Sequence, residues 1–134
     1  MSGDAVGGVR KHVHDILGAA PLGVQMTYIH SHVSDATALR DFADFKQRGI
    51  ERLPLHIAKD PALSDLKNIL TIWRACRRSG VEVLHGHGAK GGLYARSVGI
   101  LIRKPVIFTP HGGSVHLRFS KVKRLLFSAV EYLL

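Results

Sequence analysis

Short apolar runs alternate along this chain with longer segments whose apolar residues recur every three or four positions. The short runs are typical of buried strands, and the longer segments are typical of helices with one buried face. The expected strands cover residues 23–29, 51–56, 81–84 and 105–109. The expected helices cover residues 9–17, 35–48, 61–79, 91–102 and 120–134. This order predicts one α/β domain, residues 1–134, with an open, mostly parallel sheet between flanking helices.

Local signals sharpen two of the expected helices. Asp60-Pro61 places a capping residue before a proline, which predicts the start of the third helix, and Gly80 predicts its end. The expected buried stripe of that helix is Leu63, Leu66, Ile69, Leu70 and Trp73. Ser34 is the expected N-cap of the second helix. The residues of the second helix expected to face the core are Leu39, Phe42 and Ala43.

The composition limits the class of protein. With 46% hydrophobic residues among 134, the chain is too apolar for a disordered protein and long enough for one buried core. No apolar run approaches the length of about 20 residues that spans a bilayer, and no secretion signal is expected. The single cysteine, Cys76, excludes an internal disulfide and suits the cytoplasm, and we expect it to be a buried core residue.

The charge balance is strongly basic. There are 19 Lys and Arg against 10 Asp and Glu, which gives a formal net charge of +9. Such a charge favours an anionic partner: nucleic acid, an acidic membrane surface or a phosphorylated substrate. Lys121, Lys123 and Arg124 are candidate contacts with a membrane or another anion. Nucleic acid is disfavoured, because the basic helices carry no neighbouring aromatic residues on which bases could stack.

Two segments rich in glycine and histidine directly follow the third and fourth expected strands. They are residues 85–92 (HGHGAKGG) and 109–113 (TPHGG). In open parallel sheets, ligands bind at the carboxyl ends of the strands. Glycine lets a ligand approach the backbone, histidine exchanges protons near neutral pH, and Lys90 adds a positive charge. We therefore expect both segments to be ligand-binding loops that suit a phosphate-bearing substrate.

His85 and His87 also form a His-x-His pair, a pattern found in some metal sites. Neither segment contains Asp or Glu, so we expect no metal and no other cofactor, and a metal-dependent hydrolase built on this pair is one alternative. Because side chains alternate along a strand, we expect one of the two histidines to point into the sheet, and His85 to be that structural residue. Five other histidines are expected to be solvated or satisfied locally: His12, His14, His30, His32 and His56.

Three motifs, in this order, resemble the N-terminal domain of a family 4 glycosyltransferase, the retaining class with the GT-B architecture. Residues 7–13 (GGVRKHV) resemble the family's glycine turn and first helix. Residues 84–92 (LHGHGAKGG) resemble its fourth strand and loop, and residues 106–113 (VIFTPHGG) resemble its fifth strand and histidine-containing loop. The resemblance extends across nearly the whole chain and implies a Rossmann-like fold.

The resemblance implies transfer of a sugar from a nucleotide-diphosphate donor to a glycan acceptor. Members with this lysine–glycine loop often use polyprenyl-diphosphate-linked acceptors, which implies a cytoplasmic protein at the inner face of the membrane. By motif match, His111 is the catalytic candidate and reaches toward the reacting sugar or an acceptor phosphate. The candidates near the donor phosphates in the cleft are Gly7, Gly8, Gly112 and Gly113. The candidates for acceptor binding are His87, Gly88, Lys90 and Gly91.

The chain departs from the family pattern in two respects. Only residues 1–6 precede the glycine turn, and they are not strand-like, whereas the family has a strand there. The family's C-terminal donor-binding domain has no counterpart in the 134 residues. We therefore expect a partial domain that is inactive alone, with the missing half on another chain as one possibility. A non-catalytic basic module that binds an anionic membrane or nucleic acid is the second hypothesis.

Overall fold

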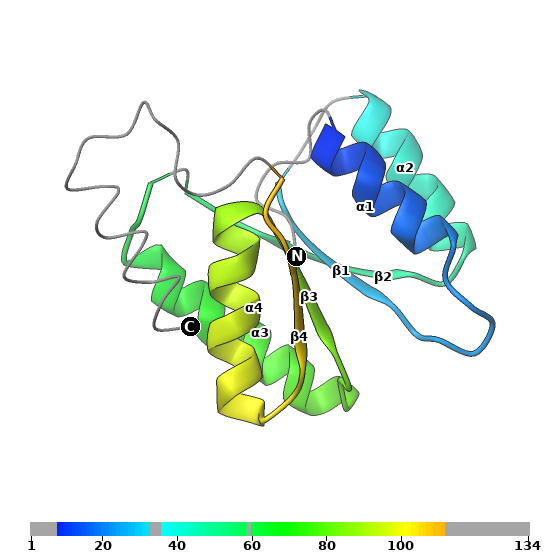
Figure 1. The fold of residues 1–134 in the computed structure, drawn as a ribbon. Helices are drawn as coiled ribbons and strands as arrows, with labels where there is room; N and C mark the ends of the chain where they lie inside the picture. The colour runs from blue at the N-terminus through cyan, green and yellow to red at the C-terminus, as the bar shows by residue number, and fades with distance from the viewer. Residues whose placement is uncertain (1–7, 33–35, 59, 112–134) are drawn as a thin grey trace.

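The computed structural model describes residues 8–32, 36–58 and 60–111. Within these residues, helices and strands alternate along the chain (Figure 1), which confirms the predicted α/β class. The helices are α1 (Gly8–Gly18), α2 (Ala36–Gln47), α3 (Ser64–Ser79) and α4 (Gly88–Ile102). The strands are β1 (Thr27–Ser31), β2 (Glu51–Leu55), β3 (Leu84–His87) and β4 (Val106–Thr109). The last expected helix, residues 120–134, lies outside the described residues.

The strands pair in parallel, as the alternating order predicts. β1 pairs with β2, placing Ile29 opposite Leu53, and β3 pairs with β4, placing His85 opposite Ile107. Parallel neighbours need a crossover connection, and α2 and α4 supply it within the two pairs. Helices α1 and α2 lie together on one side of the β1–β2 pair, and α3 and α4 lie on the other side (Figure 1).

Two hydrophobic clusters fill the space on the two sides of β1. Neighbouring residues of a strand point to opposite faces, and Tyr28 and Ile29 do so. Tyr28 packs with side chains of α1 and α2, in a cluster that also contains Val13, Leu17, Ala38, Phe42, Phe45 and Ile50. Ile29 packs toward α3 and α4, in a cluster that also contains Leu55, Ile72, Cys76, Leu84, Tyr94, Ala95 and Val98. Cys76 is therefore the buried core residue that was predicted, and burial raises the pKa of its thiol.

The buried face of α2 differs from the predicted one. Leu39 is 57% exposed and Ala43 is also exposed, so their assignment to the core was wrong. The buried residues are Ala38, Phe42 and Phe45. These three recur at helical spacing and include both phenylalanines, whose large rings bury more apolar area than Leu39 and Ala43 would.

The start and the buried face of α3 also differ from the prediction. The helix begins at Ser64 rather than at Asp60-Pro61, and the Asp65 carboxylate accepts the backbone N–H of Ala62 at 2.9 Å in place of a conventional cap. Within the predicted stripe, Leu63, Leu66 and Leu70 are exposed. Ile69 and Trp73 of the stripe are partly buried against the core, as predicted. The fully buried residues are Asp65, Asn68, Ile72 and Cys76. Compared with the prediction, α3 is rotated about its own axis, because Asp65 and Asn68 find hydrogen-bond partners inside the protein. Gly80 ends it in the left-handed conformation, as predicted.

Strand boundaries moved at two of the four strands. β1 and β3 begin and end later than the expected runs 23–29 and 81–84, whereas β2 and β4 match 51–56 and 105–109 closely. Ahead of β1 and β3, Val24 and Val83 are exposed, whereas Met26 and Val81 pack on the edges of the hydrophobic clusters without belonging to the paired strands. In the part of the chain that the structure describes, no helix has the length and apolar character needed to span a membrane.

Candidate functional site

Strand β3 passes directly into α4, where the sequence predicted a ligand-binding loop. His87 is both the last residue of β3 and the N-cap of α4, and Gly88 follows as the first helical residue. Gly88 has a φ of 65°, a left-handed conformation that glycine adopts without steric cost. Lys90 and Gly91 therefore lie in the first turn of a helix, and the prediction of a loop over residues 85–92 was wrong.

Close packing of α4 on β3 and β4 explains the glycines that had suggested a loop. A Cβ atom on Gly86 would lie 2.5 Å from the carbonyl oxygen of Gly91 and 2.9 Å from the Cβ of Ala95. A Cβ atom on Gly92 would overlap the ring of Phe108. Gly86 lets β3 approach the backbone of α4, and Gly92 lets α4 pack on the Phe108 ring of β4. Together they fix the end of β3 against the start of α4.

His85 and His87 lie on the same face of β3, so the expectation that only one of them points into the sheet was wrong. Residues two apart in a strand share a face, and the two ring centroids lie 4.1 Å apart. His85 Nε2 lies 2.8 Å from the hydroxyl oxygen of Thr109, on the neighbouring strand β4. His85 thus links β3 to β4, while His87, only 4% exposed, ends the strand.

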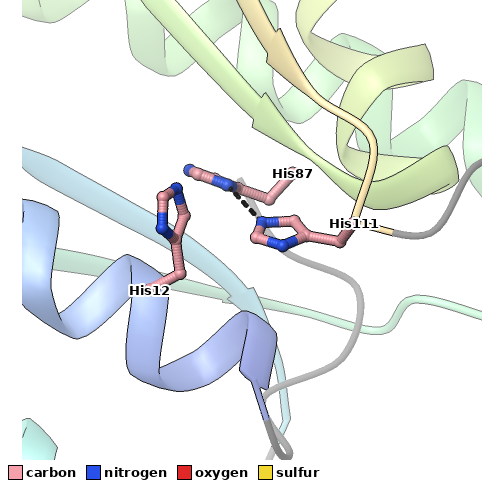
Figure 2. A group of neighbouring side chains, drawn as sticks. All are labelled: His12, His87 and His111. Atoms are coloured by element: carbon pink, nitrogen blue, oxygen red, sulfur yellow. Dashed lines mark hydrogen bonds between the residues drawn. The ribbon is translucent and has the colours of Figure 1, made fainter.

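His111 meets His87 at the carboxyl ends of the two paired strands. It follows the end of β4 by two residues and has a φ of 50°, which is uncommon for a residue with a Cβ atom. Its Nε2 lies 3.0 Å from Nδ1 of His87, a hydrogen bond in which one imidazole donates and the other accepts (Figure 2). The structure therefore brings together the two predicted segments, 24 residues apart, at one edge of the sheet.

His12 of α1 is a third imidazole at this edge. Its ring centroid lies 5.0 Å from that of His111 and 5.5 Å from that of His87. Figure 2 shows it on α1, across from the other two rings. We call His12, His87 and His111 the histidine cluster. We expected His12 to be solvated or satisfied locally, and it is exposed. Its place beside His87 and His111 was not expected, and the one signal for it is its position one helical turn after the glycine turn.

A second group of polar residues, which the sequence did not predict, joins α3 to α4. Lys90 Nζ lies 2.5 Å from the carboxylate of Asp65 and donates to the carbonyl of Asp60 at 2.9 Å. The Tyr94 hydroxyl donates to the other oxygen of Asp65 at 2.5 Å, and Asn68 donates to the Tyr94 oxygen at 3.2 Å. We call Asp65, Asn68, Lys90 and Tyr94 the polar network. Because Lys90 is paired here, its charge is neutralised within the protein.

The remaining predicted site residues fall into two groups. Gly8 begins α1, one turn before His12, and therefore lies on the same side of the domain as the histidine cluster. Six others lie outside the described residues: Gly7, Gly112, Gly113, Lys121, Lys123 and Arg124.

Comparison with protein families settles the relationship of the chain. The sequence profile of the glycosyl transferase 4-like domain matches residues 7–134. The chain belongs to this family. No curated protein and no solved structure gives a significant match. The α/β architecture of this glycosyl transferase 4-like domain, with its parallel strand pairs, is Rossmann-like in character. Membership supports a general role in glycosyl transfer and, with it, binding of nucleotide sugars and acceptors.

Burial lowers the pKa of three histidines at this edge of the glycosyl transferase 4-like domain, His85, His87 and His111, and so favours their neutral form at pH 7. Desolvation, reinforced by the neighbouring His85, lowers the pKa of His87 to about 3. Desolvation also lowers the pKa of His85 and of His111, and repulsion from His12 adds to the effect at both. Each neutral ring offers one N–H donor and one acceptor nitrogen. The rings can therefore hydrogen-bond to a sugar or phosphate, but they add no positive charge.

We expect the domain to lose stability as the pH falls from 6.5 toward 4. An unfolded histidine has a pKa of about 6.5, so below that pH the unfolded chain binds a proton that the folded His87, with its pKa of about 3, does not bind. The stabilisation is complete above pH 6.5 and is lost as the pH falls toward 3. At pH 5, His87 alone should cost about 2 kcal/mol relative to neutral pH. Urea unfolding at pH 7, 6 and 5 measures this change.

Two variants test whether His87 causes this dependence. His87→Gln should flatten that part of the pH profile, whereas His56→Gln, at an exposed position, should retain it. If His87→Gln lost stability between pH 7 and 5 as steeply as the unaltered chain, His87 would not be its source.

Proposed function

We propose that this domain is the acceptor-side domain of a glycosyltransferase, which moves a sugar from a nucleotide-diphosphate donor to a glycan linked to polyprenyl diphosphate. The observation that carries the proposal is the meeting of His87 and His111 at the carboxyl ends of β3 and β4, within a domain of this family. That edge is where ligands bind in open parallel sheets. The net charge of +9 supports an anionic, membrane-bound acceptor and a place at the inner face of the membrane.

In this proposal each part of the edge has a separate task. His111 contacts the reacting sugar or an acceptor phosphate through its neutral ring, and His87 holds it by their shared hydrogen bond. The first backbone N–H groups of α4, at Gly88 and Gly91, face an acceptor phosphate as in other helix N-termini. Lys90 acts as a positioning residue, because its contact with Asp65 fixes the first turn of α4.

The donor side of the cleft completes the proposal. Gly8, with Gly7, Gly112 and Gly113, lies near the donor phosphates, and a C-terminal domain of the family holds most of the donor. Lys121, Lys123 and Arg124 contact the anionic membrane surface. The transfer uses no metal or other cofactor. The 134 residues by themselves should then give no transfer when mixed with sugar nucleotide and acceptor.

Binding to vesicles tests the acceptor assignment. Vesicles of a zwitterionic lipid doped with polyprenyl diphosphate should bind the domain more tightly than vesicles brought to the same net charge with an ordinary anionic lipid. His111→Ala should weaken the binding to the polyprenyl diphosphate vesicles about tenfold, through the loss of a hydrogen bond to a charged group. His56→Ala, at an exposed position, is the matched control and should bind as the unaltered chain does.

The outcomes of this vesicle experiment separate the hypotheses. Equal binding to both kinds of vesicle, with a steep decline as salt is raised, would favour a basic module that recognises charge alone. No binding to either kind would overturn the acceptor assignment. Efficient transfer by the 134 residues alone would contradict the division of donor and acceptor between two domains.

A further inference from the structure

The histidine cluster collects imidazoles from three separate segments: α1, the end of β3 and the residues after β4 (Figure 2). One ring nitrogen from each residue lies within 4.8 Å of the other two. Around a tetrahedral zinc ion, with Zn–N bonds of about 2.0–2.1 Å, neighbouring ligand nitrogens lie about 3.4 Å apart. The His87–His111 pair, at 3.0 Å, is already close to this spacing. His12 is exposed, so a side-chain rotation can bring it the remaining distance.

The ligand chemistry of the cluster is selective. Within the described residues, the group contains imidazoles only, with no carboxylate. Imidazole suits zinc, copper, nickel and cobalt, whereas magnesium and calcium prefer oxygen ligands. Three protein ligands also leave a fourth coordination position for water or a substrate oxygen.

We propose that His12, His87 and His111 bind one transition-metal ion of the Zn²⁺ class. The ion replaces the hydrogen bond between Nδ1 of His87 and Nε2 of His111. The hydrogen of that bond moves to the other nitrogen of the donating ring, so both rings remain neutral and both lone pairs face the metal. His85 is not a ligand here, because its Nε2 lies against Thr109. Its ring packs on His87 and restricts the rotation of that ligand.

Metal binding has a structural consequence. Val13 and Leu17 of α1 belong to the hydrophobic cluster around Tyr28, whereas Leu84 of β3 belongs to the other cluster. An ion held by His12 and His87 therefore links the two packed halves of the domain. Since the ion binds only the folded chain, it stabilises that state. The site does not depend on the proposed transfer, which uses no metal.

Metal titration tests the site directly. Chain without an affinity tag, stripped with chelator, is titrated with Zn²⁺ by calorimetry and with Co²⁺ by visible absorption. We expect one ion per chain and, at a hundredfold excess of Zn²⁺ over its Kd, a rise in melting temperature of about 10 °C. Mg²⁺ at the same concentration should produce neither effect.

Substitutions on α1 assign the ligands. His12→Ala should weaken Zn²⁺ binding at least tenfold and leave the metal-free melting temperature unchanged, because this ring is exposed. His12→Cys supplies a thiolate and should restore binding. His14→Ala, on the same helix two residues further, is the matched control and should bind within twofold of the unaltered chain. Absence of binding, unchanged binding by His12→Ala, or an equal loss in His14→Ala would each overturn the proposal.

Discussion

Replacing Lys90 by methionine should destabilise the domain by about 3 kcal/mol. The change leaves the Asp65 carboxylate, whose side chain is 9% exposed, without its only ionic partner among the described contacts. Removing one member of a buried ion pair costs about 3–5 kcal/mol, and the hydrogen bonds that Asp65 keeps with Tyr94 and Ala62 reduce that cost here. Urea unfolding at pH 7 measures the difference.

The pKa values of the polar network support this expectation. Burial by itself would raise the pKa of Asp65, but hydrogen bonds from Lys90, Tyr94 and the Ala62 amide hold it below its ordinary value of 3.8. Burial and the neighbouring carboxylate raise the pKa of Tyr94 to about 12, so its hydroxyl remains a donor at neutral pH. The Asp65 contribution is therefore present above pH 4 and is lost as the pH falls through its folded pKa.

Two further variants separate the ion pair from the loss of a lysine. Lys67→Met, at an exposed position on α3, should change the free energy of unfolding by less than about 0.5 kcal/mol. Asp65→Leu combined with Lys90→Met should recover part of the stability, since neither charge is then buried alone, although the Tyr94 hydroxyl loses its acceptor. If Lys90→Met proved as stable as Lys67→Met, the contact with Asp65 would be a surface pair of little energetic value.

The alternation of apolar runs was enough to predict the fold class. The fold class depends on which segments are buried, and the apolar runs mark those segments. The same pattern could not show which side of α3 faces inward. Leu66 and Leu70 have the spacing of a core stripe, yet Asp65 and Asn68 are the residues that face inward. They do so because they bind Lys90 and Tyr94, which lie about 25 residues further along the chain. Partners so distant in sequence carry no periodic signal, so the polar network was not predictable from this helix alone.

The contact between His87 and His111 could be predicted from the sequence, whereas the third imidazole and the packing of the glycines could not. That His87 and His111 would lie near each other follows from the parallel sheet, whose strands end at the same edge. The third imidazole, His12, comes from a helix that packs in the other hydrophobic cluster, and local spacing does not connect it to the strands. The glycines of residues 85–92 were predicted to let a ligand approach the backbone. Gly86 instead allows close contact between β3 and α4.

Gly86→Ala should destabilise the domain by about 3 kcal/mol, and Gly86→Val by more. The added Cβ would lie 2.5 Å from the carbonyl oxygen and 2.8 Å from the carbonyl carbon of Gly91, and these are backbone atoms that cannot rotate away. Relief requires α4 to move off β3, which is overpacking of a kind that costs about 1–3 kcal/mol or more. Such a shift would also displace the adjacent His87 and the paired Lys90. Urea unfolding measures the loss, and weaker Zn²⁺ binding by the folded variant would report the displacement of His87.

Two other glycines provide controls with distinct physical causes. Gly88 has open space around its Cβ position but a φ of 65°, so Gly88→Ala should cost only the strain of a left-handed residue, about 1–2 kcal/mol. Gly8 has open space and lies in α1, so Gly8→Ala should be neutral or slightly stabilising. The expected order of destabilisation is therefore Gly86, then Gly88, then Gly8. If Gly86→Ala were as stable as Gly8→Ala and instead reduced ligand binding alone, Gly86 would serve a ligand's approach and not the packing of α4 on β3.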